Sequence, residues 1–421
     1  MQDPADLAYF AALDRRLVEA VRGIRLLEAI SWPASAQRKF LSRWHGGRIE
    51  LPKIDYAEYD YSAVREELDA IQHEARAAED HPIGGYVRRT AESWEIATRL
   101  LESVGTRDVA VHSAALFGKP GDFLPGSDYH NIDAARHFID LADELSKELA
   151  TVEADYVISA GTMQEELQDR LDAFFVHHHV RVEIDPKLTA KAAAGTTRIR
   201  LRADTGFTEY DRHQLLEHEA FVHSLTALNG RAQPHLASMA RNSPRITATQ
   251  EGLATFAELI TGAIDIQRMK RISLRILAID RAQNGADFIE VFRFFLDAGQ
   301  NENDSFASTA RIFRGVPVEG GAAFTKDTVY LHGLLSVHTF FRWALKNQKL
   351  KLCRNLFAGK MTLHDVIALE PWFDNGYIAP PLYLPPWVQK ANGLAGMLAF
   401  SLFANKIRLD RVEAFDLTLG A

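Results

Sequence analysis

The stretch LEHEAFVH, residues 216–223, contains the pattern H-E-x-x-x-H and decides how the rest of the chain is interpreted. Two imidazoles and one further carboxylate can hold a zinc ion and leave a fourth position open for water. A glutamate beside the first histidine, here Glu219, then takes a proton from that water and passes it to the leaving amine. The pattern therefore indicates a hydrolytic zinc site with His218 and His223 as metal ligands.

The spacing of the two histidines has a structural consequence. On a regular α-helix, side chains four residues apart lie about 40° apart around the axis, whereas side chains five residues apart lie about 140° apart. His218 and His223 are five residues apart, so they could not both coordinate one ion from a regular helix. One extra residue accommodated as a π-bulge would bring the two rings together, and such bulges are frequent at functional sites. We therefore expect a helix distortion between Glu219 and His223.

A second motif, QEGLA at residues 250–254, supplies a candidate carboxylate in Glu251. A glutamate in the first turn of a helix is also favoured by the helix dipole, which is the alternative explanation for Glu251. Gly252 costs about 1 kcal/mol relative to alanine inside a helix. Close approach of this helix to the one that carries His218 and His223 would explain Gly252 and Ala254 together.

Four segments carry a family resemblance: HEAFVHSLTALNGRAQ (218–233), TQEGLA (249–254), RIFRG (311–315) and TKDTVYLHG (325–333). They resemble, in family order, the flavohemoglobin expression-modulating QEGLA motif proteins of bacteria. The animal branch of that family includes the microtubule-associated tyrosine carboxypeptidase, which removes the C-terminal tyrosine of α-tubulin. The resemblance covers roughly residues 130 to 345.

The resemblance implies a zinc metallopeptidase with one zinc ion per chain. His218, His223 and Glu251 would hold the metal, and Glu219 would be the general base. The arrangement is also similar to that of dipeptidyl peptidases with an H-E-x-x-G-H motif, although this chain has Val222 in place of the glycine.

The remaining family-like segments contain candidates for two further tasks. A tetrahedral intermediate needs a hydrogen-bond donor for its oxyanion, and Tyr330 is the first choice, with His332 as the second. A carboxypeptidase must also bind the terminal carboxylate, for which arginine and lysine are suited. Arg311, Arg314 and Lys326 are the candidates for this task. The alternative for each of these three is a structural ion pair with an acid such as Asp327.

The hydrophobic pattern predicts an α+β protein in which helices dominate, with a zincin-like metallopeptidase domain, a small sheet and an N-terminal helical region. Apolar residues recur at helical spacing. Alternating apolar and polar residues predict two strands, and residues 199–203 would be the edge strand along which an extended peptide docks. Asn229-Gly230 would end the helix that carries the histidines. Helices are predicted at 7–27, 35–44, 61–78, 82–104, 132–151, 162–175 and 208–228, and strands at 180–184 and 199–202.

A stretch rich in glycine and proline, residues 116–128, is the best candidate for a domain boundary. We accordingly expect an N-terminal helical region at 1–120, a zinc metallopeptidase core at 121–348, and a C-terminal helical extension at 349–421 packed on the core.

Composition limits the partners and the compartment. The 421 residues carry a net charge of −8, which argues against nucleic acid as a partner. The single cysteine, Cys353, permits no internal disulfide and favours a reducing compartment. The N-terminus lacks signal-peptide features, and the apolar residues 393–404 amount to about half the length needed to span a bilayer. We expect a cytoplasmic protein without a membrane partner, and the oligomeric state stays open.

These observations favour a zinc-dependent carboxypeptidase that trims the C-terminus of a peptide or protein. One alternative is a zinc-binding but non-hydrolytic regulator or scaffold, although a structural zinc site has no need of Glu219 and is usually closed by a fourth protein ligand. The other alternative is an aminopeptidase or dipeptidyl peptidase, which would need carboxylates to grip the substrate amine.

Overall fold

The small sheet predicted from the alternating segments is present and has one additional strand. Its strands are β1 (Arg181–Asp185), β2 (Ala192–Ala194) and β3 (Arg198–Arg202). The strand order is β1-β3-β2, with β1 parallel and β2 antiparallel to β3. The expectation that residues 199–203 form an edge strand is therefore wrong, because β3 lies in the centre and β2 is an edge. Three alanines in a row show no alternation, so the sequence pattern does not reveal β2.

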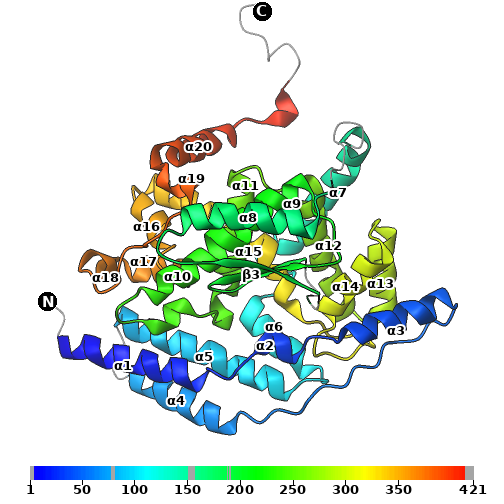
Figure 1. Cartoon of the computed structure of the whole chain (residues 1–421), viewed down its shortest axis with the longest axis horizontal. Coiled ribbons are helices and arrows are strands. Elements are labelled where there is room, and N and C mark those ends of the chain that lie inside the picture. The colour runs from blue at the N-terminus through cyan, green and yellow to red at the C-terminus, as the bar shows by residue number, and fades with distance from the viewer. Residues whose placement is uncertain (1–3, 77–80, 150–156, 187, 189–190, 413–421) are drawn as a thin grey trace, which may run out of the picture.

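The computed structural model describes residues 4–76, 81–149, 157–186, 188 and 191–412. Figure 1 shows the sheet in the middle of the view, with helices above and below it. The helices before the sheet are α1 (Pro4–Ala20), α2 (Leu26–Ala29), α3 (Ala34–His45), α4 (Ser62–Arg76), α5 (Pro82–Glu102), α6 (Asp108–Phe117), α7 (Asn131–Leu149) and α8 (Ala160–Phe174).

These helices match the predicted ranges, with two differences. α6 lies in a stretch for which the sequence predicts no helix. The first helix ends at Ala20 rather than at Leu27, since a turn around Gly23 separates it from the short helix α2. The ends of two predicted helices, at residues 77–78 and 150–151, lie outside the described residues. α1 packs on α4 and α5 at the bottom of the view in Figure 1, while α8 packs on β1 and β3.

The described part of the chain after the sheet is also mostly helical. Its helices are α9 (Glu209–Gln214), the π-helix η1 (Leu215–Ser224), α10 (Leu225–Arg231), η2 (Ala237–Ala240), η3 (Pro244–Ile246), α11 (Thr247–Ile260), α12 (Ile266–Gln283), α13 (Phe288–Asp297), α14 (Glu302–Ile312), η4 (Thr325–Thr328), α15 (Val329–Lys346), α16 (Leu350–Asn355), α17 (Leu363–Ala368), α18 (Glu370–Asp374), α19 (Pro386–Gln389), α20 (Ala391–Ala404) and η5 (Leu409–Arg411). Helix dominance and the α+β class are thus confirmed.

Asn229 and Gly230 lie inside α10 and do not end it, contrary to the prediction. A Cβ atom on Gly230 would be 2.1 Å from the carbonyl oxygen of Met239, so the glycine serves close packing rather than a left-handed turn. The amide of Asn229 donates to the carbonyls of Phe357 and Tyr383 at 2.7 and 2.8 Å. Gly230 therefore allows close packing against η2, and Asn229 holds the C-terminal extension against this helix.

α11 and α15 form the central helix pair, and Gly252 is where they meet. A Cβ on Gly252 would be 2.3 Å from the backbone of Gly333 on α15. The close approach that explains Gly252 is thus to α15, and not to the histidine-bearing helix as predicted. One cluster of buried apolar residues extends from Phe10 to Leu398, while the division at residues 120 and 348 stays a prediction. Within the described residues, no helix is both long enough and apolar enough to cross a membrane.

Candidate metal and catalytic site

The π-helix η1 brings the two histidines of H-E-x-x-x-H together. The backbone N–H of Leu225 donates to the carbonyl of Ala220, five residues earlier, as in a π-helix. The rings of His218 and His223 have centroids 4.8 Å apart. The predicted distortion is confirmed, and it extends over ten residues rather than a single bulge.

Glu251 of α11 completes a cluster with both histidines. Its Oε2 lies 3.5 Å from Nε2 of His218 and 3.6 Å from Nε2 of His223. With zinc bonds of about 2.0–2.1 Å, two ligand atoms at the corners of a tetrahedron lie about 3.3–3.4 Å apart. Two imidazole nitrogens and one carboxylate oxygen, all within 4.8 Å of one another, are a donor set that fits zinc. These three residues could therefore hold the metal that the sequence predicts.

Lys326 of η4 binds the other carboxylate oxygen of Glu251. Its buried ammonium donates to Oε1 at 2.9 Å, which leaves Oε2 facing the histidines. Burial disfavours the charged carboxylate, but the charge of Lys326 and hydrogen bonds from His218 and His223 hold the pKa of Glu251 well below its ordinary value. The carboxylate is therefore ionised, as a metal ligand must be.

Glu258 lies behind His218 on the same helix as Glu251. The carboxylate can only accept, so Nδ1 of His218 donates to Oε1 of Glu258, at 2.6 Å. In a neutral ring, this bond selects the tautomer whose Nε2 carries no proton, which is the form that can bind a metal ion. Arg268 of α12 holds both oxygens of the fully buried Glu258, at 2.5 and 2.7 Å.

Glu219 lies against the edge strand β2. The backbone N–H of Ala194 donates to Oε2 of Glu219 at 3.0 Å. Two further contacts hold β2 in place: Ser224 donates to the carbonyl of Gly195 at 2.7 Å, and Lys191 pairs with Asp211 at 2.6 Å. The proposed general base is thus positioned beside the edge of the sheet.

The three predicted carboxylate-binding residues have different surroundings. Arg311 makes a bidentate pair with Asp327, with both N···O distances at 2.6 Å, which is the structural alternative that the sequence left open. Burial opposes the charge of Asp327, but Arg311 and Arg275 lower the pKa of this carboxyl overall. Lys326 is engaged by Glu251, so Arg314 is the remaining candidate.

Among the described residues, the structure assigns no hydrogen bond or ion pair to Arg314. Burial, reinforced by the charge of Arg311, lowers the pKa of Arg314 to about 10. Arg275 of α12 is also incompletely paired: its buried Nε makes no hydrogen bond and lies 3.6 Å from Oδ2 of Asp327. This corner of the site therefore contains more positive charge than Asp327 can balance.

Tyr330 lies next to the cluster, whereas His332 contacts a different part of the chain. The hydroxyl of Tyr330 is 3.3 Å from Nζ of Lys326, which in turn binds Glu251. Nε2 of His332 is 3.2 Å from the carbonyl oxygen of Phe123, in the loop after α6. Of the two predicted oxyanion donors, Tyr330 is the one connected to the cluster.

Sequence analysis missed Glu258, Arg268, Arg275 and Lys360. A signal existed for Glu258, because it follows Glu251 by seven residues and residues seven apart share a helix face. Arg268 and Arg275 are also seven apart, but no spacing connects them to a predicted site residue. No pattern marks Lys360, whose buried ammonium donates to the carbonyl of His223 at 3.2 Å. Burial lowers the pKa of Lys360 to about 8.

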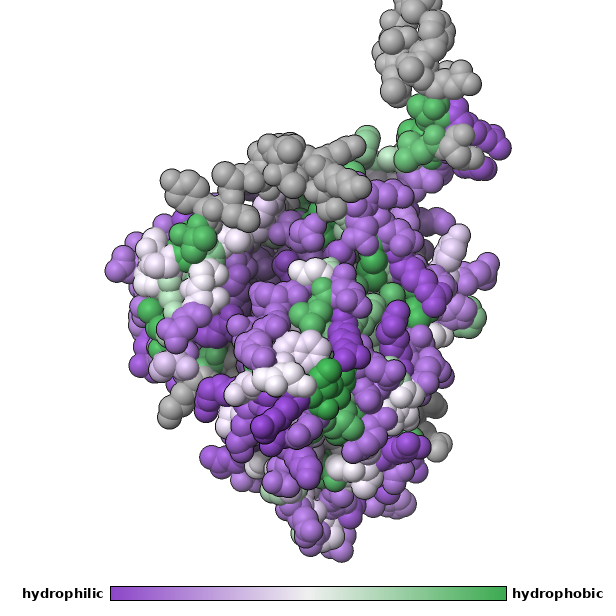
Figure 2. All heavy atoms as spheres, turned by 90° about the vertical axis from the view of Figure 1, so that its right-hand side faces the viewer, coloured by the Kyte–Doolittle hydropathy of each residue, from purple (hydrophilic) through white to green (hydrophobic). Residues whose placement is uncertain are grey.

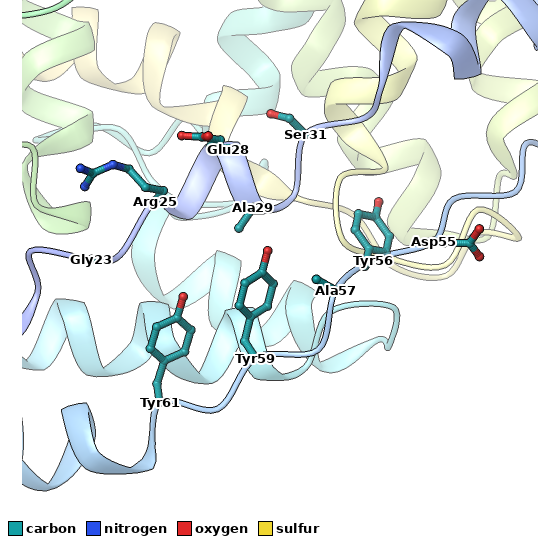
Figure 3. Close-up of a pocket in the computed structure, with 10 residues that line it drawn as sticks. All are labelled: Gly23, Arg25, Glu28, Ala29, Ser31, Asp55, Tyr56, Ala57, Tyr59 and Tyr61. Carbon is teal, nitrogen blue, oxygen red and sulfur yellow. The ribbon is translucent and has the colours of Figure 1, made fainter.

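A pocket of about 370 Å³ lies elsewhere, between residues 23–31 and 55–61 (Figure 3). Tyr59 and Tyr61 point toward α2 in that view, and their rings stack 5.9 Å apart. The hydroxyl of Tyr56 accepts from Trp32 at 2.7 Å and from the backbone of Gly315 at 2.9 Å, so it holds two segments together. None of the lining residues belongs to the histidine and glutamate cluster.

A family model described as microtubule-associated tyrosine carboxypeptidase matches residues 39–406. This range is wider than the stretch from 130 to 345 in which the motifs lie, and it includes the whole cluster around His218. No curated protein is significantly similar to the chain.

Proposed function

Because the chain belongs to the microtubule-associated tyrosine carboxypeptidase family, we propose that it is a zinc-dependent carboxypeptidase with a zincin-like catalytic domain. Its substrate would be the C-terminus of a peptide or protein. The observation that carries the proposal is the convergence of His218, His223 and Glu251 beside Glu219.

The three cluster residues would hold one zinc ion per chain. When bound, zinc supplies Lewis acidity, which polarises a carbonyl group and makes water a better nucleophile near neutral pH. Glu219 takes the proton of the attacking water and delivers it to the nitrogen of the scissile peptide bond as that bond breaks. Ala194 holds one carboxylate oxygen of Glu219 and so orients the side chain for this transfer.

Tyr330 and Arg314 would bind two polar groups of the substrate, the developing oxyanion and the terminal carboxylate. The hydroxyl of Tyr330 is the donor for the developing oxyanion, and the nearby ammonium of Lys326 keeps its surroundings positive. Arg314, which is not engaged by an acid, would bind the terminal carboxylate. Arg311 would act indirectly, since it neutralises Asp327.

The charge balance favours a carboxypeptidase over an aminopeptidase. Arg275 and Arg314 are cations with incomplete partners, whereas Glu251, Glu258 and Asp327 are each paired with a lysine or an arginine. A substrate amine would find no uncommitted acid among these groups. An extended substrate would add to the edge strand β2, next to Glu219, rather than to β3 as the sequence suggests.

The family name refers to microtubules and to tyrosine. A chain of net charge −8 has no long-range attraction for an acidic tubulin tail, so we assign neither a terminal residue nor a particular protein as substrate.

The test compares wild type, Glu219→Gln and Glu217→Gln. Glu217 lies on the same π-helix, where burial raises its pKa to about 7, and its neighbours are Trp387 and Arg170 rather than the cluster, so its variant controls for the loss of a carboxyl group on η1. Each protein is assayed for zinc content and is incubated with peptides of diverse C-termini, which are analysed by mass spectrometry. Wild type and Glu217→Gln should bind about one zinc ion and shorten peptides from the C-terminus, whereas Glu219→Gln should bind zinc without cutting.

The other outcomes separate the alternatives. Zinc binding without cleavage by any variant would favour a non-hydrolytic regulator. Shortening from the N-terminus would favour an aminopeptidase or dipeptidyl peptidase. A wild-type protein that binds no metal would overturn the site assignment.

A further inference from the structure

Helix α20 is apolar all round and lies at the top of the molecule in Figure 1. Residues 391–404 include no charged side chain. A helix that is apolar on every side is normally buried. In α20, however, only Leu394 and Leu398 are buried, and the helix contacts α15 and α19 along that side.

The opposite side of α20 and the segment after it expose large apolar side chains. Phe400 is 75% exposed and Phe403 is 68% exposed, and further on Leu409 is 80% exposed. We call the exposed set the C-terminal apolar face; it comprises Met397, Phe400, Phe403, Ile407 and Leu409. In Figure 2, green hydrophobic atoms lie beside purple hydrophilic ones where the described chain ends, next to the grey C-terminal residues.

Basic residues flank and interrupt this segment of the chain although the protein is acidic, and Nζ of Lys406 lies 6.0 Å from the ring centroid of Phe403. Four exposed basic residues lie within residues 390–412, against one acid, Asp410. Residues 413–421 add two acids, so residues 390–421 carry a net charge of +1 and the preceding 389 residues carry −9, which together give −8. The four basic residues are Lys390, Lys406, Arg408 and Arg411.

We propose that the C-terminal apolar face docks on the surface of an anionic lipid bilayer. Apolar side chains next to lysines and arginines are the combination that holds interfacial helices in the headgroup region. A second copy of the chain fits less well, because a twofold pairing would bring the basic residues of both copies together. The segment after α20 extends away from the other helices in Figure 1, so the face suits a flat, deformable surface rather than a groove.

This proposal differs from the expectation of no membrane partner, which rested on the length needed to span. A helix of 14 residues is about 21 Å long, shorter than the roughly 30 Å hydrocarbon core, but it can lie in the plane of the interface. Docking does not depend on the proposed peptidase activity, so either proposal can fail without the other.

The test is sedimentation of the full chain with vesicles of phosphatidylcholine alone or of phosphatidylcholine with phosphatidylglycerol. Three variants are compared with wild type: Phe400→Glu/Phe403→Glu, Lys406→Glu/Arg411→Glu, and Val111→Glu. Val111 is equally exposed, at 67%, but lies on α6 in the lower part of Figure 1, so it is the matched control. Circular dichroism and the mass in solution are measured for every protein.

Wild type and Val111→Glu should bind the anionic vesicles, and binding should weaken as salt is raised. The phenylalanine variant should bind at least about tenfold more weakly, because burial of each ring contributes more than a tenfold change in affinity. The lysine and arginine variant should lose the preference for anionic vesicles. The proposal is overturned if wild type binds neither vesicle, if the phenylalanine variant binds as well as wild type, or if wild type is a dimer that Phe400→Glu/Phe403→Glu dissociates.

Discussion

Replacing Glu258 by glutamine removes a negative charge from behind His218 while nearly preserving the shape of the side chain. In the native site, one oxygen of Glu258 accepts from Nδ1 of His218 and both oxygens accept from Arg268. A glutamine can still accept through one oxygen, but its NH₂ group would face the guanidinium of Arg268. The NH₂ group and the guanidinium are both hydrogen-bond donors, so they would not bond to each other. The buried charge of Arg268 would also lose the carboxylate that neutralises it.

The structure gives an expected loss of stability and an expected loss of zinc affinity for this variant. Removing one partner of a buried ion pair typically costs about 3–5 kcal/mol, and Glu258 is fully buried with Arg268 as its cation. Loss of a carboxylate that orients a metal-bound histidine lowers metal affinity by about 10–100-fold, which corresponds to about 1.4–2.7 kcal/mol. We therefore expect Glu258→Gln to be less stable without metal and also to bind zinc more weakly.

Zinc affinity is measured by competition with a chelator, and the free energy of unfolding by urea titration of the metal-free protein. Glu92→Gln is the control: Glu92 is a surface residue whose partner Arg88 is 3.6 Å away, so both quantities should stay within about 0.5 kcal/mol of wild type. The double variant Glu258→Gln/Arg268→Gln should recover stability but not zinc affinity. Zinc affinity of Glu258→Gln within threefold of wild type would refute the role assigned to Glu258.

Three further changes test other parts of the structure. Gly252→Ala places a Cβ 2.3 Å from the backbone of Gly333, so α11 and α15 must separate, and urea unfolding should show a loss of about 1–3 kcal/mol; an unchanged midpoint would contradict the packing. Arg314→Met should lower kcat/KM for peptides with a free C-terminus about tenfold or more, with little effect on C-terminally amidated peptides, and an equal loss for both would exclude carboxylate binding. Burial raises the pKa of Asp14 to about 6, so the folded state holds this proton more tightly than the unfolded chain does. As pH rises from 4 to 7, the unfolding free energy of wild type minus that of Asp14→Asn should therefore fall by about 2 kcal/mol, and a constant difference would show that the pKa is not raised.

Much of the candidate metal site could be predicted because its signals are local in sequence. His218, Glu219 and His223 lie within six residues, and five-residue spacing of two ligands predicts the distortion that η1 shows. The spacing of apolar residues that is typical of helices and of strands likewise depends on neighbouring residues. The α+β class and most helix ranges therefore follow from the hydrophobic pattern. Glu258 could have been found in the same way, from its seven-residue distance to Glu251.

Contacts between distant segments could not be predicted. Whether Arg311 or Arg314 is available to a substrate depends on which of them Asp327 binds, and both lie within 16 residues of it. Asn229-Gly230 has the composition of a helix end, but packing against Met239 and the C-terminal extension keeps it helical. β2 consists of alanines and is recognisable as a strand only through its pairing with β3.

The sequence by itself determined the residue types of the histidine and glutamate cluster, the distortion of the helix that carries the histidines, and the dominance of helices, because each depends on spacing along one segment. Only the tertiary structure decided which charges neutralise one another, which strand lies at the edge, and which apolar helix remains exposed at the C-terminal end. Those outcomes depend on distances between atoms far apart in the chain, and a side chain engaged by a distant partner looks the same in the sequence as one that is available to a ligand.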